Sequence, residues 1–234
     1  MSFIINPQVL NSSIVTSGLV MNLVASNIRS YNLTGNWNDL TGNNNNGTFS
    51  GTQPPTYNRG VFDFRYSGNS RFVIPATSTN NISTGSLGVW VRQTGPNQAT
   101  GGGGLYQGIV IKQNSWGLFS LGNNNNLIAY GWFGTGIILN TGINIFDSQW
   151  RYVVVTFNQM GTTSGFGRVY VNGDLTVSGI FRSSIFNNIV TIGHGNFSNQ
   201  YFNGSIGETH LYNRVLTDAE VLENFNATRW WYGI

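Results

Sequence analysis

Short runs of β-branched and aromatic residues recur along the chain, and clusters of Gly, Asn and Ser separate them. Such runs are typical of strands, and the separating clusters are typical of tight turns. Ser86–Arg92 and Trp150–Asn158 show the strongest pattern and predict strands buried on one face or both. Many short antiparallel strands at this spacing predict an all-β sandwich or barrel. The other expected strands are Gly18–Leu23, Val61–Arg65, Arg71–Ile74, Gly108–Lys112, Trp116–Leu121, Leu127–Tyr130, Gly167–Val171, Ile189–Ile192 and Ser205–Asn213.

Two local motifs add a hairpin and a single helix to this pattern. Asn172-Gly173 lies between two β-rich runs and is typical of a two-residue hairpin turn. Thr217 is followed three residues later by Glu220, which is a capping box and predicts a helix start near the C-terminus. The apolar stripe expected on that helix is Val221, Leu222 and Phe225.

The composition excludes several classes of site and partner. Charged residues make up only 8% of the chain, against about 25% in ordinary globular domains. The net charge of +3 comes from scattered arginines and the single Lys112, without the basic patch that nucleic-acid binding needs. There is no cysteine, which excludes disulfides and thiolate metal sites. No apolar run approaches the roughly 18 residues of a membrane helix.

The ends of the expected domain and its loops can also be assigned. Residues 1–17 lack the strand pattern and are expected to be an N-terminal arm, with a single domain over residues 18–234. The first residues lack the basic and apolar regions of a signal peptide. Three low-complexity pieces are expected to be loop tips, namely Asn43–Asn46, Gly101–Gly104 and Asn123–Asn126.

Several of these segments, in order, resemble one family. Gly18–Asn27 and Trp37–Thr48 resemble the opening of laminin-G-like, concanavalin A-like jelly-roll domains. The resemblance implies an antiparallel jelly-roll β-sandwich with one short C-terminal α-helix. The sequences of the first loop and of the C-terminal segment are similar to those of a subset of the family, which is found in virion proteins of marine tailed phages and related viruses. The remaining segments that carry the resemblance are Val61–Phe64, Ser86–Val91, Val169–Gly173, Phe202–Glu208, Leu211–Thr217, Glu220–Val221 and Asn224–Arg229.

The resemblance implies a non-enzymatic virion surface protein, either a capsid decoration protein or a tail or fibre component. Such a protein would dock on capsid or tail proteins of the same virion through the arm of residues 1–17 and an aromatic patch. A homo-oligomer is expected, a trimer if the protein sits at a capsid three-fold position. The alternative is a carbohydrate-binding, lectin-like module that recognises host-surface glycans. Neither function involves nucleic acid or a membrane.

Catalytic motifs known from this fold do not occur in the sequence. Glucanases of the fold carry Glu-x-Asp-x-x-Glu on one strand, which places two carboxylates at the spacing for glycoside hydrolysis. The sequence has no such motif, and it has no nucleophile elbow. His194 lies between glycines and is expected in a surface turn, while Glu208 and His210 alternate on one strand and are expected to form a surface contact. We therefore predict no enzymatic activity.

Aromatic residues outside the strongest strand patterns are the candidate binding residues. A sugar site needs an exposed aromatic platform and neighbouring amides, and an exposed aromatic cluster also suits a protein interface. The C-terminal cluster is open to a third interpretation, closure of the core. The candidates are Tyr106, Tyr130, Trp132 and Phe133 in the middle of the chain and Trp230, Trp231 and Tyr232 at its end.

Calcium is the one cofactor that the resemblance suggests, because many relatives use it to shape a loop. Calcium takes six to eight oxygen ligands, usually including carboxylates. Asp39 lies in the matching loop and is the specific candidate, whereas the family often has Asp where this chain has Val24. The alternative is that Asp39 caps a turn, and no other cofactor is expected.

Overall fold

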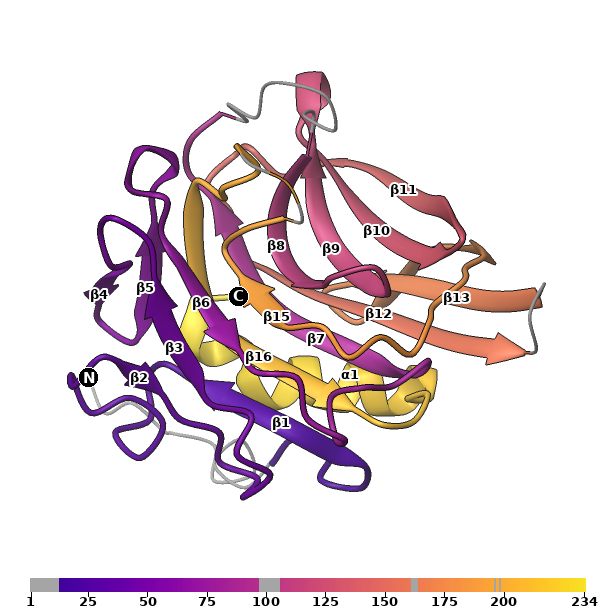
Figure 1. Ribbon diagram of the computed structural model, residues 1–234, viewed down its shortest axis with the longest axis horizontal. Helices are drawn as coiled ribbons and strands as arrows, with labels where there is room; N and C mark the ends of the chain where they lie inside the picture. The colour runs from indigo at the N-terminus through magenta and orange to yellow at the C-terminus, as the bar shows by residue number, and fades with distance from the viewer. Residues whose placement is uncertain (1–12, 97–105, 161–163, 196, 198) are drawn as a thin grey trace, which may run out of the picture.

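The computed structural model describes residues 13–96, 106–160, 164–195, 197 and 199–234, which form two stacked antiparallel sheets (Figure 1). The expected antiparallel β-sandwich with one short C-terminal helix is confirmed. The first sheet has the order β14-β13-β12-β7-β16-β5-β4, with β1 also paired to β16. Its strands are β1 (Leu19–Val24), β4 (Thr56–Asn58), β5 (Val61–Phe64), β7 (Thr84–Gln93), β12 (Arg151–Met160), β13 (Ser164–Val171), β14 (Asp174–Ile180) and β16 (Gly204–Tyr212).

The second sheet has the order β11-β10-β9-β8-β15-β6-β3-β2. No helix in the part of the chain that the structure describes is long and apolar enough to cross a membrane. The strands of the second sheet are β2 (Asn36–Trp37), β3 (Gly47–Ser50), β6 (Arg71–Ile74), β8 (Tyr106–Lys112), β9 (Trp116–Leu121), β10 (Asn126–Phe133), β11 (Thr135–Asn144) and β15 (Val190–Ile192).

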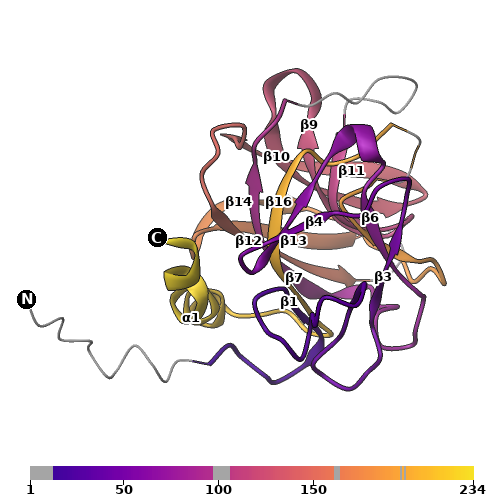
Figure 2. The ribbon, with the colours of Figure 1, turned by 90° about the vertical axis from the view of Figure 1, so that its left-hand side faces the viewer.

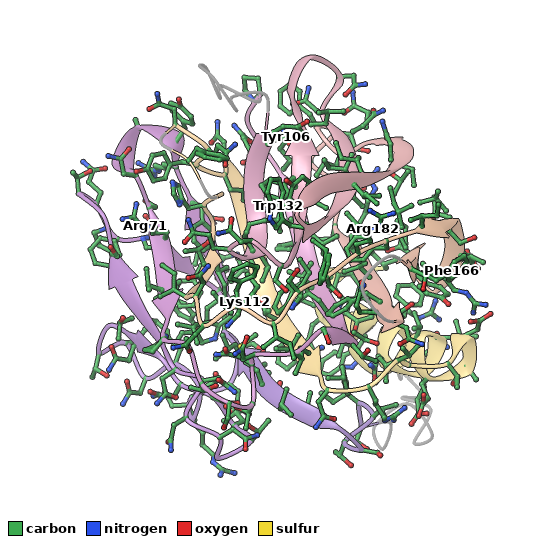
Figure 3. All side chains as sticks on the ribbon, turned by 45° about the vertical axis from the view of Figure 1, so that its right-hand side comes forward. Arg71, Tyr106, Lys112, Trp132, Phe166 and Arg182 are labelled. Atoms are coloured by element: carbon green, nitrogen blue, oxygen red, sulfur yellow. The ribbon has the colours of Figure 1, made fainter. Side chains whose placement is uncertain are left out.

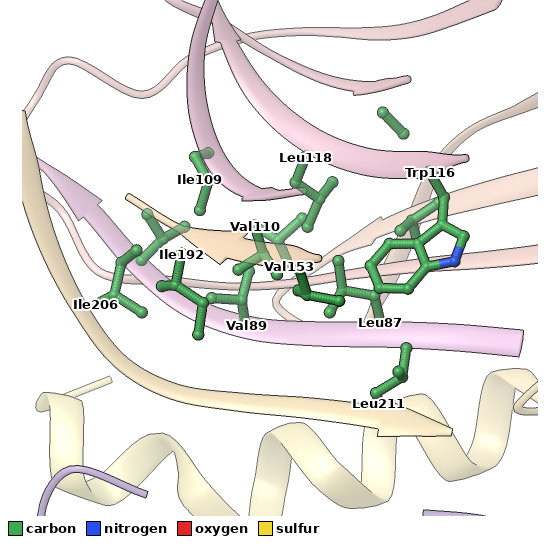
Figure 4. Packing of buried hydrophobic residues seen from close by; sticks show 14 of the residues in the cluster. Leu87, Val89, Ile109, Val110, Trp116, Leu118, Val153, Ile192, Ile206 and Leu211 are labelled. Carbon is green, nitrogen blue, oxygen red and sulfur yellow. The ribbon is translucent and has the colours of Figure 1, made fainter. Parts of the chain in front are cut away.

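The main core fills the space between the sheets (Figure 4). Leu87 and Val89 from β7 meet Val110 from β8 and Leu118 from β9, and all four side chains are fully buried. Alternate residues of each strand face this core, which is the period-two pattern of a half-buried sheet. The other face of the second sheet carries a smaller apolar cluster with partly exposed aromatic side chains around it.

The helix α1 (Asp218–Thr228) covers the outer face of the first sheet (Figure 2). Trp90, Tyr212 and Phe225 form a second buried cluster beneath it. The expectation of a Glu208–His210 surface contact is wrong, because both side chains lie under this layer with exposed fractions of 3% and 0%. Their side chains still approach each other, with His210 Nε2 3.3 Å from Glu208 Oε2.

The N-terminal segment joins the same layer. Val15 is buried, and its N–H donates to Asn224 Oδ1 on α1 at 2.7 Å. The Tyr212 hydroxyl donates to the Val15 carbonyl at 3.0 Å. The last residues of the expected arm therefore pack on the chain's own helix, and residues 1–12 lie outside the described residues.

The expected hairpin is present, and one expected loop tip is wrong. Asn172 and Gly173 have φ angles of 54° and 91° and join β13 to β14, as a tight Asn-Gly turn requires. Asn45, expected in a loop tip, is fully buried. Its amide donates to the Val20 carbonyl at 2.6 Å and accepts from Asn80 at 2.9 Å, so the loop is held by an amide network. Gly101–Gly104 lies outside the described residues.

The capping box at the start of α1 is confirmed. The Glu220 amide donates to Thr217 Oγ1 at 3.3 Å, and the Thr217 amide donates to Glu220 Oε2 at 2.8 Å. The expected apolar stripe needs one correction, because Leu222 is exposed and the polar Asn224 is buried in its place. The helix follows a 3.6-residue period, so Asn224 shares a face with Val221.

We expect the Glu220→Gln variant to lose a stabilising contribution that depends on pH. Hydrogen bonds from Arg214 lower the pKa of Glu220 from its ordinary 4.5 to about 2. The folded state therefore favours the carboxylate, so the contribution is complete above pH 4.5 and lost as the pH falls towards 2. Because both side chains are partly exposed, it should amount to about 0.5–1 kcal/mol. Urea unfolding at pH 6, 4 and 3 measures it, with the exposed Glu223→Gln as the control. A constant difference between wild type and Glu220→Gln across this range would contradict the prediction.

Candidate functional site

The solvent-facing side of the second sheet carries a run of aromatic rings. Tyr106 and Phe119 have ring centroids 5.8 Å apart, Phe119 and Tyr130 5.7 Å, and Tyr130 and Trp132 6.3 Å. We call these four residues the aromatic run. Tyr106 and Trp132, both labelled in Figure 3, are the two ends of this run. Three of the predicted binding residues thus share one surface.

Strand alternation explains why the aromatic run lies on this face. Leu127 and Ala129 of β10 point into the core, so Tyr130 and Trp132 point outwards. The same rule turns Phe119 outwards on β9, because it follows the core residue Leu118. Antiparallel pairing of β8, β9 and β10 then brings the rings of three strands together.

The rings also cover apolar side chains of this face. Ile111, Phe119 and Ile128 point away from the sandwich core, yet their exposed fractions are only 1%, 4% and 0%. Tyr106 and Tyr130 pack against them and remain partly exposed. The face is therefore an apolar platform on which Tyr106 and Tyr130 remain accessible to a ligand.

The neighbouring strand β11 makes room for this platform. Gly136 lies opposite Trp132 in the β10–β11 pairing. A Cβ at Gly136 would lie 2.6 Å from the Tyr130 hydroxyl oxygen, so only glycine allows this ring to extend across β11. Burial raises the pKa of Tyr130, which keeps its hydroxyl protonated and able to donate a hydrogen bond.

Exposed amides lie beside the aromatic run. Asn140 of β11 is opposite Ile128, and it accepts a hydrogen bond from the Asn126 side chain at 3.3 Å. None of the strands of the second sheet contains Asp or Glu. The face therefore combines aromatic rings with amides and has no carboxylate on its strands.

Phe133, a predicted binding residue, is separated from the aromatic run. It follows Trp132 in β10 and lines a different, apolar cavity of about 440 Å³. Ser83, Gln159 and Phe186 contribute to the same wall. The sequence grouping of Tyr130, Trp132 and Phe133 does not hold in space, because adjacent strand residues point to opposite faces.

The three predicted residues at the C-terminus also separate. They belong to a 3₁₀ turn that follows α1, on the opposite side of the sandwich from the aromatic run. Tyr232 stacks on Trp90 with centroids 4.1 Å apart and helps to close the cluster under α1. Trp230 and Trp231 stack on each other and are 49% and 57% exposed.

Asp39, the calcium candidate, organises its own loop. Its Oδ1 accepts from the amides of Asn22 and Thr41 at 2.9 and 3.0 Å. Its Oδ2 accepts from the Thr41 hydroxyl at 2.8 Å and from the Asn45 amide at 3.1 Å. Among the described residues no group of three or more His, Asp or Glu gathers as a metal site would require. These contacts favour the turn-capping alternative, and calcium binding stays a prediction.

Sequence reasoning overlooked part of the face. Phe119 completes the aromatic run, and the alternation of β9 could have revealed it. Arg71, Thr191 and His194 line a polar cavity of about 100 Å³ on neighbouring elements. No sequence signal connects these three residues, because Arg71 lies more than a hundred residues before the other two.

Two solved structures to which this chain is similar are binding domains. The binding domain of Paraclostridial Mosquitocidal Protein 1 matches with a TM-score of 0.68 and 20% identity, over 90% of this chain and 52% of that one. The binding domain of botulinum neurotoxin serotype D/C matches with a TM-score of 0.65 and 18% identity, over 90% and 52%. The chain therefore spans about half the length of these toxin domains.

A third similar structure covers a whole domain. Domain 4 of AbnA, an extracellular arabinanase from Geobacillus stearothermophilus, was solved in complex with arabinotriose. It matches with a TM-score of 0.62 and 19% identity, over 89% of this chain and 98% of that one. At these identities the similarity establishes the jelly-roll fold.

The family assignment comes from the sequence itself. No curated protein matches the chain significantly. The family model Laminin_G_3, described as the concanavalin A-like lectin/glucanases superfamily, matches residues 66–222. This range includes the aromatic run, the capping box and most strands of both sheets. The chain is therefore a member of the concanavalin A-like lectin/glucanases superfamily.

Proposed function

We propose that the chain is a carbohydrate-binding module that holds an oligosaccharide on the aromatic run. The observation that carries the proposal is the set of three partly exposed rings, Tyr106, Tyr130 and Trp132, which the buried Phe119 joins on one face of the sheet. Aromatic rings offer flat apolar surfaces to the C–H faces of sugar rings, and the Tyr and Trp tips hydrogen-bond to hydroxyls. The amides of Asn126 and Asn140 lie beside the rings and suit the same hydroxyl groups.

The distribution of carboxylates supports binding without hydrolysis. Glycoside hydrolysis needs two carboxyl groups on either side of the scissile bond. The strands that form the open face carry none. Glu208 lies buried under α1 on the other sheet, away from the aromatic run. The arabinotriose complex of the similar arabinanase domain adds support from a relative of the same fold.

The Trp132→Ala variant should bind oligosaccharides about tenfold more weakly than wild type. One stacked ring contributes about 0.5–1.5 kcal/mol beyond its buried area, and tenfold corresponds to about 1.4 kcal/mol. A microarray of arabinan, xylan, glucan, galactan and uronic-acid oligosaccharides identifies a ligand, and isothermal titration calorimetry then measures the affinity.

Trp231→Ala is the matched control, because Trp231 is an exposed tryptophan on the other side of the molecule. It should leave the affinity unchanged. Absence of binding to every oligosaccharide would refute the proposed function. Equal loss in Trp231→Ala, with Trp132→Ala unaffected, would move the site to the C-terminal pair.

A place on a virion surface, as a capsid decoration or a tail component, rests on the sequence resemblance and stays a prediction. It is compatible with glycan binding, since a surface protein of a particle can also contact host glycans. Mass spectrometry of gradient-purified particles would test it by counting copies per major capsid protein. One copy per capsid subunit would favour decoration, a few copies would favour a tail or fibre, and absence would remove the virion hypothesis together with its capsid partners and trimer.

A further inference from the structure

A polar hollow lies on the same open face as the aromatic run. It is a cavity of about 100 Å³ lined by Arg71, Gln113, Thr191 and His194, with Ile189 and Gly195. Arg71 comes from β6, and Thr191 comes from β15, which pairs with β6. We call the four polar residues the cationic hollow.

Arg71 gives the hollow a positive charge that no carboxylate neutralises. All eight Asp and Glu residues belong to the described part of the chain, and none lies within ion-pair distance of Arg71. One guanidinium nitrogen donates to the Tyr201 hydroxyl at 3.1 Å, and the group lies 5.8 Å from the centre of that ring. A guanidinium has five N–H donors, and this is its one hydrogen bond to a described residue, so further donors can serve an oxyanion.

His194 contributes a polar atom that lacks a partner. Its ring packs against Tyr201 with centroids 4.4 Å apart, and its buried Nε2 makes no hydrogen bond to any residue that the structure describes. Burial and then the charge of Arg71 lower the pKa of His194 to about 4, so the ring is neutral near pH 7. A buried, unpaired nitrogen costs free energy. Because the other ring nitrogen interacts with the Phe197 backbone, Nε2 of the neutral ring is an acceptor, and a sugar hydroxyl in the hollow would donate to it.

The cationic hollow continues into the aromatic run through the strand register. Thr191 lies opposite Ile111 of β8, Ile111 lies opposite Gly117, and Gly117 lies opposite Tyr130 of β10. Four strand spacings separate β6 from β10, or about 19 Å at roughly 4.8 Å each. A ligand that reaches both ends is therefore an oligosaccharide and not a single sugar.

We propose that the cationic hollow binds the carboxylate or sulfate group of an acidic oligosaccharide whose sugar rings lie on the aromatic run. The inference rests on the proposed function and names its ligand class. Arg71 supplies charge-assisted hydrogen bonds to the anion, and Gln113, Thr191 and His194 line the space around it. Because the protein carries few charges overall, the positive charge of Arg71 is a local source of selectivity for acidic ligands.

The hollow can be tested first with the anion alone. Sodium sulfate and glucuronate are titrated separately, and the imidazole signals of the two histidines are followed by NMR. We expect the His194 signals to shift with saturation, while His210, buried under α1, serves as the internal control and does not move. In Arg71→Gln the response should disappear, with unchanged His210 signals showing that the fold is intact. An unresponsive His194, or equal shifts in Arg71→Gln, would overturn the proposal.

The second test compares oligosaccharides that differ only in charge. Polygalacturonate is compared with its methyl ester, and sulfated with desulfated galactan, so that the two arms separate carboxylate from sulfate. We expect wild type to prefer the acidic member at least tenfold and Arg71→Gln to lose this preference while keeping its affinity for the neutral one. Arg29→Gln, which removes an exposed arginine from the loop after β1, should keep the preference.

The outcomes separate this inference from the proposed function. Equal binding of acidic and neutral oligosaccharides by wild type, with loss in Trp132→Ala, would overturn the cationic hollow and leave the carbohydrate-binding function in place. Absence of binding to every oligosaccharide would overturn both, even where sulfate alone still moved the His194 signals.

Discussion

Replacement of Asn224 by alanine should lower the free energy of unfolding by about 2–4 kcal/mol, because two buried hydrogen bonds are lost and their partners stay buried. Asn224 is fully buried and accepts from the Val15 amide. Its Nδ2 donates to the Tyr212 hydroxyl at 3.0 Å, and that hydroxyl donates to the Val15 carbonyl. The three residues form a closed ring of hydrogen bonds that joins the N-terminal segment, β16 and α1. Urea unfolding followed by tryptophan fluorescence measures the change.

Asn226→Ala is the matched control for this prediction. Asn226 is on the same helix and exposed, so its replacement should change the free energy of unfolding by less than about 0.5 kcal/mol. Similar losses in both variants would show that helix propensity, and not the hydrogen-bond ring, determines the effect. Glycan binding should remain unchanged in both variants, because α1 lies on the opposite side of the molecule from the aromatic run.

The second effect is expected at Lys112, the single lysine of the chain. Its side chain is 1% exposed, and its ammonium donates to Asn80 Oδ1 at 2.9 Å and to the Asn188 carbonyl at 2.7 Å. Lys112→Met keeps the apolar stem but leaves both acceptors without this donor. We expect the free energy of unfolding at pH 7 to fall by only about 1 kcal/mol, because Asn80 Oδ1 keeps the Thr77 amide as a donor and removal of the buried charge offsets part of the loss.

This difference between wild type and Lys112→Met should increase at alkaline pH. Burial lowers the pKa of Lys112 from its ordinary 10.5 to about 8. Between these values the unfolded chain holds the proton that the folded protein has released, so raising the pH stabilises the folded wild type relative to the variant. The slope is at most about 1.4 kcal/mol per pH unit.

Urea unfolding of both proteins at pH 7, 8, 9 and 9.5 measures this dependence. The Lys112→Met variant is the reference, because it retains every tyrosine whose titration also affects stability in this pH range. The tyrosine contributions therefore cancel in the difference between the two proteins. Parallel pH profiles would contradict a lowered pKa for the buried amine.

The central strands could be predicted from the sequence, and the strands at the sheet ends could not. β7 and β12 are buried between neighbours, and their continuous apolar runs reveal them. β11 and β14 lie at the ends of the two sheets and expose Ile138, Leu175 and Ile180 among polar residues and glycines. An end strand has one paired edge and weaker burial, so its sequence resembles that of a loop.

The burial of certain polar residues was a second feature that could not be predicted from the sequence. Glu208 and His210 alternate as surface residues of a two-layer sandwich would, but α1 adds a third layer over them. The capping box predicted the helix without indicating which sheet face it covers. Likewise Asn45 belongs to an Asn-rich stretch typical of a loop tip, and only its distant partners Val20 and Asn80 explain its burial.

The candidate site, like the fold, could be predicted from the sequence only in part. Tyr106, Tyr130 and Trp132 could be predicted because their rings interrupt a region of glycines and amides. The alternation of side chains along β10 separates Phe133 from these three residues. The register of β9 with β8 and β10 places Phe119 between Tyr106 and Tyr130. The cationic hollow depends on the pairing of β6 with β15, which joins residues more than a hundred positions apart. Such long-range pairing is fixed by the packed sheet and leaves no local pattern.

The antiparallel pairing of β1 with β16 also determines how this domain would respond to tension. Leu19 at the start of β1 lies beside Tyr212 at the end of β16, and the chain leaves both strands at the same edge. A pull on residues 13 and 234 would therefore first load the contacts of Val15 with α1 and of Tyr232 with Trp90, and then separate the two strands one hydrogen-bonded pair at a time. Strands that are pulled apart one hydrogen-bonded pair at a time separate at lower force than strands that are sheared along their length. Mechanical strain would thus dissipate at the helix side, while the sheet that carries the aromatic run would keep its shape.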